Sequence, residues 1–386
     1  MIRVGQHRID LTYVGLILFM ISTIVNTAQF GASLSWVIIP CMIILLGLFC
    51  GKQYVDRSAC LIYIFYLFCF ISTMFSHYVR LQRDMLTFAF FCIIYILVVS
   101  HKYSIEQIKQ LNKIYIIVAL FISLNILYNW ITHNYYIEWF KRASFSFAGV
   151  YKDPNYVMAF IVPAMILCLF KIFFERNYWK KFLFALFELI MMTNFITTGS
   201  RGPLLTFLLS VILFFISKSS MSATKKIKLM FMIGLVIISG WNILLKVLPV
   251  QSIERLFHST SDSRTKLWES ALVIFYNNPI LGGGEGAASK ASVTLLGNYS
   301  HNVYLDILVN SGILGFISFL LFFVINCMQT SKKNIYFILP MGIAFMFPLF
   351  FINGFNTATF YLPLIYMSIL SRFCIDKNFH AEELLL

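Results

Sequence analysis

The sequence is poor in charge and rich in apolar residues. Only 12% of its 386 residues are charged, whereas soluble domains carry about 25%. Hydrophobic residues make up 60%, and Phe alone occurs 41 times. Because a soluble fold cannot bury that much apolar surface, the composition excludes a soluble protein and predicts an all-α polytopic membrane protein.

Several motifs of soluble enzymes are also missing. The 8 Cys include no Cys-x-x-Cys pair, so neither a metal site nor a disulfide framework is expected. The sequence has no Asp-x-Asp pair, no Walker sequence and no Gly-x-Ser-x-Gly elbow. The glycines at 282–284 and 286 follow no predicted strand, which argues against a dinucleotide-binding loop. We therefore expect no metal and no cofactor.

The chain instead contains about twelve apolar runs of the length that a transmembrane helix needs. They cover residues 11–28, 32–50, 59–76, 85–100, 114–132, 156–174, 182–198, 202–217, 229–248, 303–327, 336–352 and 357–374. Most Lys and Arg fall on one side of this map, so the positive-inside rule places both termini in the cytoplasm. The chain has 30 Lys and Arg against 16 Asp and Glu. We expect this excess of positive charge to set the membrane topology and to contact anionic lipid rather than to bind nucleic acid.

The map divides the chain into three parts. Residues 1–248 hold nine membrane helices, 249–302 form a large outer loop, and 303–386 hold three further helices and a cytoplasmic tail. Inside the loop, Asp262 or Ser263 can begin a helix that the Asn-Asn-Pro sequence at 277–279 ends. A second outer segment lies at 133–155. Because the other loops are short, chemistry is expected on the outer face.

Arg201 lies in a short outer turn between the seventh and eighth apolar runs. Pro203 suits the first turn of a helix. Arg201 is therefore expected beside the free N–H groups of a helix N-terminus, a setting that favours a phosphate. The alternative is an arginine that snorkels to the membrane boundary.

Two further residues lie at predicted helix starts. Arg264 begins the loop helix, where a cation opposes the helix dipole, so it is either a rim charge or a ligand for an anion. His301 begins the tenth run, where the dipole disfavours an imidazolium and leaves a neutral ring that can accept a proton. A lone His is more often structural. Asp306, nearby, should be paired with Asn302 or with an arginine, and Gly312 and Gly315 should mark a kink or close helix packing.

A set of motifs connects these residues. They are Thr-Gly-Ser-Arg-Gly at 198–202, Ser-Arg-Thr-Lys-Leu-Trp at 263–268 with Asn-Pro-Ile-Leu-Gly-x-Gly at 278–284, Ser-His-Asn-x-Tyr-Leu at 300–305 with Ser-Gly-Ile-Leu-Gly at 311–315, and Asp-Pro-Asn at 153–155. With these motifs, the number of runs and the long outer loop, the chain resembles the O-antigen polymerase and O-antigen ligase superfamily of bacterial membrane glycosyltransferases.

The resemblance implies a fold, a location and a reaction. The fold would be that of the lipid-dependent integral membrane glycosyltransferases, called GT-C-like, in the bacterial inner membrane with a periplasmic active site. The donor would be a glycan on undecaprenyl pyrophosphate, transferred to a sugar hydroxyl of an acceptor glycan without metal or nucleotide. Membrane lipid and a chain-length regulator protein are the further partners expected, and nucleic acid is not.

The resemblance also implies residue roles. Arg201 and Arg264 would bind the pyrophosphate, and His301 would be the catalytic base. Weaker candidates for substrate binding are Tyr304, Asn302, Glu285, Arg80, Arg83 and Lys152. The favoured function is a polymerase that joins lipid-linked repeat units. The alternatives are a ligase that transfers the glycan to lipid A–core, although the loop is short for that branch, and a lipid-linked glycan flippase or secondary transporter, although no internal repeat is visible.

Overall fold

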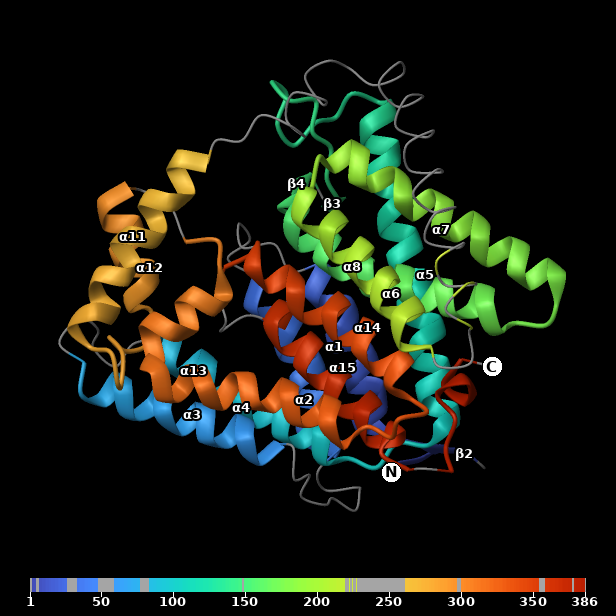
Figure 1. Ribbon diagram of the computed structural model, residues 1–386, viewed down its shortest axis with the longest axis horizontal. Helices are drawn as coiled ribbons and strands as arrows, with labels where there is room; N and C mark the ends of the chain where they lie inside the picture. Colours follow the sequence, from blue (N-terminus) through green and yellow to red (C-terminus); the bar gives the residue numbers. More distant parts are fainter. Residues whose placement is uncertain are drawn as a thin grey trace. The chain divides into compact units, whose positions relative to one another are not determined.

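The computed structural model describes most of the chain. The described residues are 2–4, 7–25, 33–47, 59–76, 83–147, 149–218, 222, 224, 227, 261–296, 300–353, 358–376 and 378–385. They are predominantly helical, and their strands form two small two-stranded sheets (Figure 1). The chain divides into two compact units, each assembled from three chain segments. The first unit is Met1–Gln107, Thr260–Gln329 and Leu349–Arg372, and the second is Ile108–Ser259, Thr330–Pro348 and Phe373–Leu386.

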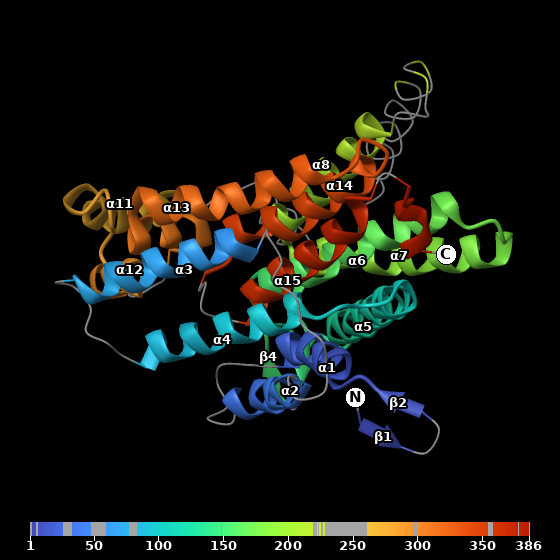
Figure 2. The ribbon, with the colours of Figure 1, turned by 90° about the horizontal axis from the view of Figure 1, so that it is seen from below.

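The first unit contains the N-terminal helices and the helices of the outer loop. Its elements are β1 (Ile2–Val4), β2 (His7–Ile9), α1 (Leu11–Val25), α2 (Ser33–Gly47), α3 (Ala59–Met74), α4 (Arg83–Ser100), α11 (Ser261–Asn277), α12 (Ala287–Leu296), α13 (Val303–Gln329) and most of α15 (Ala358–Cys374). α13 lies alongside α3, and Figure 2 shows the two helices next to each other. Phe65 of α3 packs on Phe319 of α13 with ring centroids 5.4 Å apart.

A buried polar cluster fixes the start of α1. Asp10 caps the helix by accepting the N–H of Tyr13 at 3.2 Å. Its other carboxylate oxygen is bonded to His101 Nε2 and to Gln107 Nε2, each at 2.8 Å. Burial alone would raise the pKa of Asp10, but the bonds from His101 and Gln107 outweigh it and lower the pKa to about 2.

The second unit packs four helices around α6. Its elements are most of α5 (Ile105–Ile131), the hairpin of β3 (Ser146–Phe147) and β4 (Val150–Tyr151), α6 (Pro154–Phe174), α7 (Tyr178–Thr198), α8 (Arg201–Ser217), α14 (Ile335–Met346), and the 3₁₀ turns η2 (Phe347–Phe350, shared with the first unit) and η3 (Ala381–Leu384). α6 packs against α7, α8 and α14. Tyr115 of α5 donates its hydroxyl to the carbonyl of Phe160 at 2.9 Å, and their rings stack at 4.5 Å.

The observed helices agree with the predicted apolar runs. Four helices, at Ile105–Ile131, Pro154–Phe174, Tyr178–Thr198 and Val303–Gln329, are long and apolar enough to cross a membrane, and seven shorter apolar helices fall on other predicted runs. The predicted run at 229–248 lies outside the described residues. α5 begins at Ile105, earlier than the run predicted at 114, because polar residues extend the helix beyond its apolar part. The class of helical membrane protein is therefore supported, while the count of twelve spans and the GT-C-like arrangement stay predictions.

Candidate functional site

The turn between α7 and α8 holds Arg201 as the sequence predicts. α7 ends at Gly199, whose left-handed backbone (φ 57°) donates its N–H to the carbonyl of Ile196 at 3.1 Å. Ser200 stands at the N-cap of α8, and Arg201 is the first residue of the helix, with an exposed side chain. The location at a helix N-terminus is confirmed, and the role in binding pyrophosphate stays a prediction.

Arg142 was not among the predicted site residues, although it lies in the second outer segment at 133–155. Arg142 is 4% exposed and donates Nε to the carbonyl of Thr198 at 2.5 Å. Its terminal nitrogen contacts Ser200 Oγ at 3.4 Å and Asn155 Oδ1 at 3.3 Å. The guanidinium therefore links the end of α7 to the starts of α8 and α6. Its only sequence signal was its place shortly before the Asp-Pro-Asn motif.

Lys152 lies in the same unit, directly before α6. It is 9% exposed, and burial lowers the pKa of its ammonium to about 7. Its backbone N–H donates to the carbonyl of Phe145 at 3.0 Å. Asp153 follows and caps α6 by accepting the N–H of Asn155 at 2.7 Å. The second unit therefore brings Arg142, Lys152 and Arg201 onto the segments that adjoin the starts of α6 and α8.

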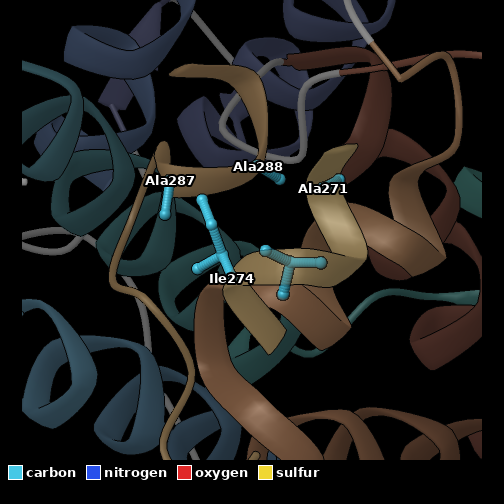
Figure 3. Packing of buried hydrophobic residues seen from close by; sticks show 5 residues of the cluster. Ala271, Ile274, Ala287 and Ala288 are labelled. Carbon is cyan, nitrogen blue, oxygen red and sulfur yellow. The ribbon is translucent and has the colours of Figure 1, made fainter. Parts of the chain in front are cut away.

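The loop helix α11 carries Arg264 in the first unit. It ends at Asn277, as predicted, and Arg264 is half-buried in its first turn. The buried face of α11 is centred on Leu267, Ala271 and Ile274, whereas Trp268 remains 36% exposed. This face packs on α12 and α13 in a small apolar cluster of Ala271, Ile274, Ala287, Ala288 and Val309 (Figure 3).

The glycine-rich turn between α11 and α12 packs against a break in α13. Gly312 has φ 64° and ψ −169°, so the helical hydrogen bonds are interrupted there. Two carbonyls near the break accept other donors: Gly283 N–H reaches Val309 O at 2.8 Å, and Gly284 N–H reaches Asn310 O at 3.0 Å. A Cβ at Gly312 would overlap the carbonyl of Ile280. The expected kink at Gly312 is confirmed, and it leaves the carbonyls of Val309 and Asn310 available to the N–H groups of this turn.

His301 lies two residues before the first residue of α13 and is half-buried. Its backbone is left-handed, with φ 51°, a conformation that is uncommon outside glycine. Asn302 caps α13 through its Oδ1, which accepts the N–H of Leu305 at 3.2 Å. The prediction placed His301 at the start of this helix, and the structure places it just ahead of the first turn. Its role as a base stays a prediction.

The weaker candidates differ in how the structure places them. Tyr304 packs on Phe350 with ring centroids 4.2 Å apart, and Glu285 is 4% exposed with its N–H bonded to Thr73 Oγ1 at 2.8 Å. Arg80 lies outside the described residues, and Arg83 is described only as the first residue of α4. Within the described part of the chain, no three His, Cys, Asp or Glu side chains gather into a group that could hold a metal.

The candidate residues thus form two groups. The first unit brings together Arg264, Glu285, His301, Asn302 and Tyr304 on α11, the glycine-rich turn and the start of α13. The second unit brings together Arg142, Lys152 and Arg201. A single site formed by both groups is a prediction.

The apolar helices define the class as a multi-pass helical membrane protein. Residues 186–320 match a family model described as O-antigen ligase. This match supports the resemblance to the O-antigen ligase and polymerase superfamily that the motifs at 198–202, 263–284 and 300–315 indicated. The comparisons with curated proteins and with solved structures each give no significant match.

Proposed function

We propose that the protein is a polymerase that transfers a glycan from undecaprenyl pyrophosphate to a sugar hydroxyl of a second lipid-linked unit. The acceptor oxygen attacks the anomeric carbon, and the bond from that carbon to the pyrophosphate breaks. The pyrophosphate keeps the electron pair, and His301 takes the proton of the attacking hydroxyl. The family match supports glycan transfer, and the polymerase assignment is our proposal within it.

The observation that carries the proposal is the setting of His301. It stands next to Asn302, the residue that caps the N-terminus of α13, in the same unit as Arg264 and inside the segment that matches the family. The helix dipole disfavours an imidazolium there, so the neutral ring can accept a proton. A positioned general base contributes a factor of roughly 10²–10⁴ in rate.

Arg201 and Arg264 would supply the electrostatic part of catalysis. A pyrophosphate leaving group gains negative charge as its bond breaks, and a guanidinium stabilises that charge through fixed, bidentate hydrogen bonds. Each arginine stands in the first turn of a helix, where free N–H groups add to the attraction for phosphate. Two such residues provide the charge that a metal ion supplies in other transferases.

A membrane-reconstituted transfer assay with a lipid-linked oligosaccharide tests this scheme. His301→Ala should leave the protein inserted and abolish transfer, while Arg201→Ala and Arg264→Ala should raise the donor concentration needed. Full transfer by His301→Ala would remove the base assignment. Inhibition by a chelator that added Mg²⁺ reverses would contradict metal-independent transfer.

The second candidate function is a ligase, which the description of the matching family favours. The two functions share the donor chemistry and differ in the acceptor. Supplying the purified protein with lipid A–core or with lipid-linked repeat units separates them. Product on lipid A–core rejects the polymerase, long lipid-linked chains reject the ligase, and lipid movement across vesicles without glycan transfer would favour a flippase over both.

A further inference from the structure

The residues on both sides of His301, Ser300 and Asn302, are each fixed by hydrogen bonds. Ser300 is 1% exposed, and its hydroxyl donates to Asp306 Oδ1 at 2.6 Å. The carbonyl of Ser300 accepts the indole N–H of Trp268 at 2.9 Å. On the other side, Asn302 caps α13 and donates its own N–H to Ser300 Oγ at 3.4 Å. Ser300 is therefore fixed from three directions.

This arrangement has an energetic reason. A left-handed backbone at a residue other than glycine costs on the order of 1–3 kcal/mol, so His301 keeps it only while its neighbours prevent relaxation. Asp306 is 2% exposed and lies in the first turn of α13, where the helix dipole stabilises its carboxylate. A buried carboxylate that accepts a hydroxyl hydrogen bond is a strong anchor. The bond from Asp306 to Ser300 therefore opposes relaxation of the strained residue.

The same network joins His301 to the helix of Arg264. Trp268 follows Arg264 by one helical turn on α11. Its indole bond to Ser300 crosses from α11 to the segment before α13, and the packing of α11 on α13 supports that contact. The backbone that carries the imidazole is thus bonded directly to the helix that carries the guanidinium.

We propose that Ser300, clamped by Trp268 and Asp306, is a positioning residue that holds the His301 imidazole in its reactive orientation relative to Arg264. The proposal rests on the proposed function, since it gives His301 a role that needs orientation. It predicts that damage to the clamp slows the chemical step and leaves donor binding largely intact.

The test compares Ser300→Ala and Trp268→Phe with Ser300→Thr in the reconstituted transfer assay. Ser300→Ala removes the hydroxyl and its hydrogen bonds with Asp306 and Asn302, and Trp268→Phe removes the indole hydrogen bond to the Ser300 carbonyl. Ser300→Thr keeps the hydroxyl. We expect kcat to fall roughly ten- to hundredfold in the first two variants, with the donor KM changed less than about threefold. Ser300→Thr should keep most of the wild-type kcat, because its hydroxyl can make the same hydrogen bonds.

Two further measurements separate positioning from folding and from the proposed function. Ser318 is a buried residue of α13, and its hydroxyl donates to the carbonyl of Gly315 at 2.7 Å. Ser318→Ala removes this hydroxyl and should keep kcat near that of the wild type. The rate at which diethyl pyrocarbonate modifies His301, followed by peptide mass spectrometry, reports on the imidazole whether or not it is the base. If His301→Ala retained full transfer, the proposed base would fail, and a changed modification rate in the clamp variants would still support the clamp.

Unchanged kcat and an unchanged His301 modification rate in both clamp variants would overturn the proposal. So would a loss of kcat in Ser300→Ala and Trp268→Phe that matched a loss of folded protein measured by thermal unfolding. In either case the hydrogen bonds would be a local feature of folding with no influence on the imidazole.

Discussion

At the scale of single residues, Lys152 is a cation that the fold has withdrawn from water. Burial lowers its pKa from 10.5 to about 7. Between these values the unfolded chain binds the proton and the folded protein releases it, so the free energy of unfolding should rise as the pH rises through this window. Below about pH 7 both states are protonated, and the full cost of burying the charge remains.

Lys152→Met should therefore remove this pH dependence and raise the unfolding temperature most at neutral pH. The measurement is the thermal unfolding midpoint of the detergent-solubilised protein between about pH 7 and about pH 10. Lys141→Met is the control, because Lys141 is only half-buried and lies 5.6 Å from the Tyr135 ring centroid. Equal slopes in wild type and Lys152→Met would show that Lys152 titrates outside this range.

Arg142 makes a second prediction at the residue scale. Its guanidinium donates to Thr198 O, Ser200 Oγ and Asn155 Oδ1. The single ammonium of a lysine cannot reach these three acceptors with the same planar arrangement of donors. Arg142→Lys should lower stability by about 1–3 kcal/mol and raise the donor KM by loosening the turn before Arg201. Thermal unfolding and donor titration measure the two effects. Normal donor use in Arg142→Lys would show that the turn holds its shape without these bonds, and Lys141→Met again serves as the control.

At the scale of elements, the break in α13 is what seats the glycine-rich turn. Gly312 supplies a backbone conformation that side chains disfavour, and it also stands against the carbonyl of Ile280. The turn bonds the carbonyls of Val309 and Asn310, and the N–H of Ile313 bonds Pro279 O at 2.9 Å. The end of α11 and the break in α13 therefore form one structural joint.

Gly312→Ala should destabilise this joint more than Gly286→Ala. Both glycines have positive φ, but a Cβ at Gly286 would meet open space, whereas one at Gly312 would meet the Ile280 carbonyl. Gly286→Ala should cost about 1 kcal/mol of backbone strain, and Gly312→Ala should cost roughly 3 kcal/mol or more. Thermal unfolding of both variants checks this order. Equal losses of stability would mean that the backbone at Ile280 moves away from the added Cβ at little cost.

These elements show which features a sequence can predict. The end of α11 and the start of α13 were predicted because apolar runs and capping residues are local signals. The hydrogen bond from the Ser300 hydroxyl to the Asp306 carboxylate was not predicted, because only Asn302 or an arginine was considered as its partner. The role of Arg142 was also missed, since Thr198 lies 56 residues further along the chain. Side-chain pairing across such separations depends on the tertiary fold, which local patterns do not encode.

At the scale of the whole molecule, the proposed site requires both units to present their residues to the same side of the membrane. The positive-inside rule places the α7–α8 turn and the 249–302 loop outside and the α6–α7 connection inside. Arg201, Lys290 and Lys180 represent these three regions, and each has an exposed side chain. Their accessibility therefore tests the topology on which the proposed function depends.

A membrane-impermeant maleimide applied to spheroplasts provides that test. Arg201→Cys and Lys290→Cys, each in a background without the 8 native Cys, should react in intact spheroplasts. Lys180→Cys should react only after the membrane is permeabilised, because its connection faces the cytoplasm. If Arg201→Cys and Lys290→Cys reacted from opposite sides, Arg201 could not share a pyrophosphate with Arg264. The first unit would then have to bind the leaving group without the second.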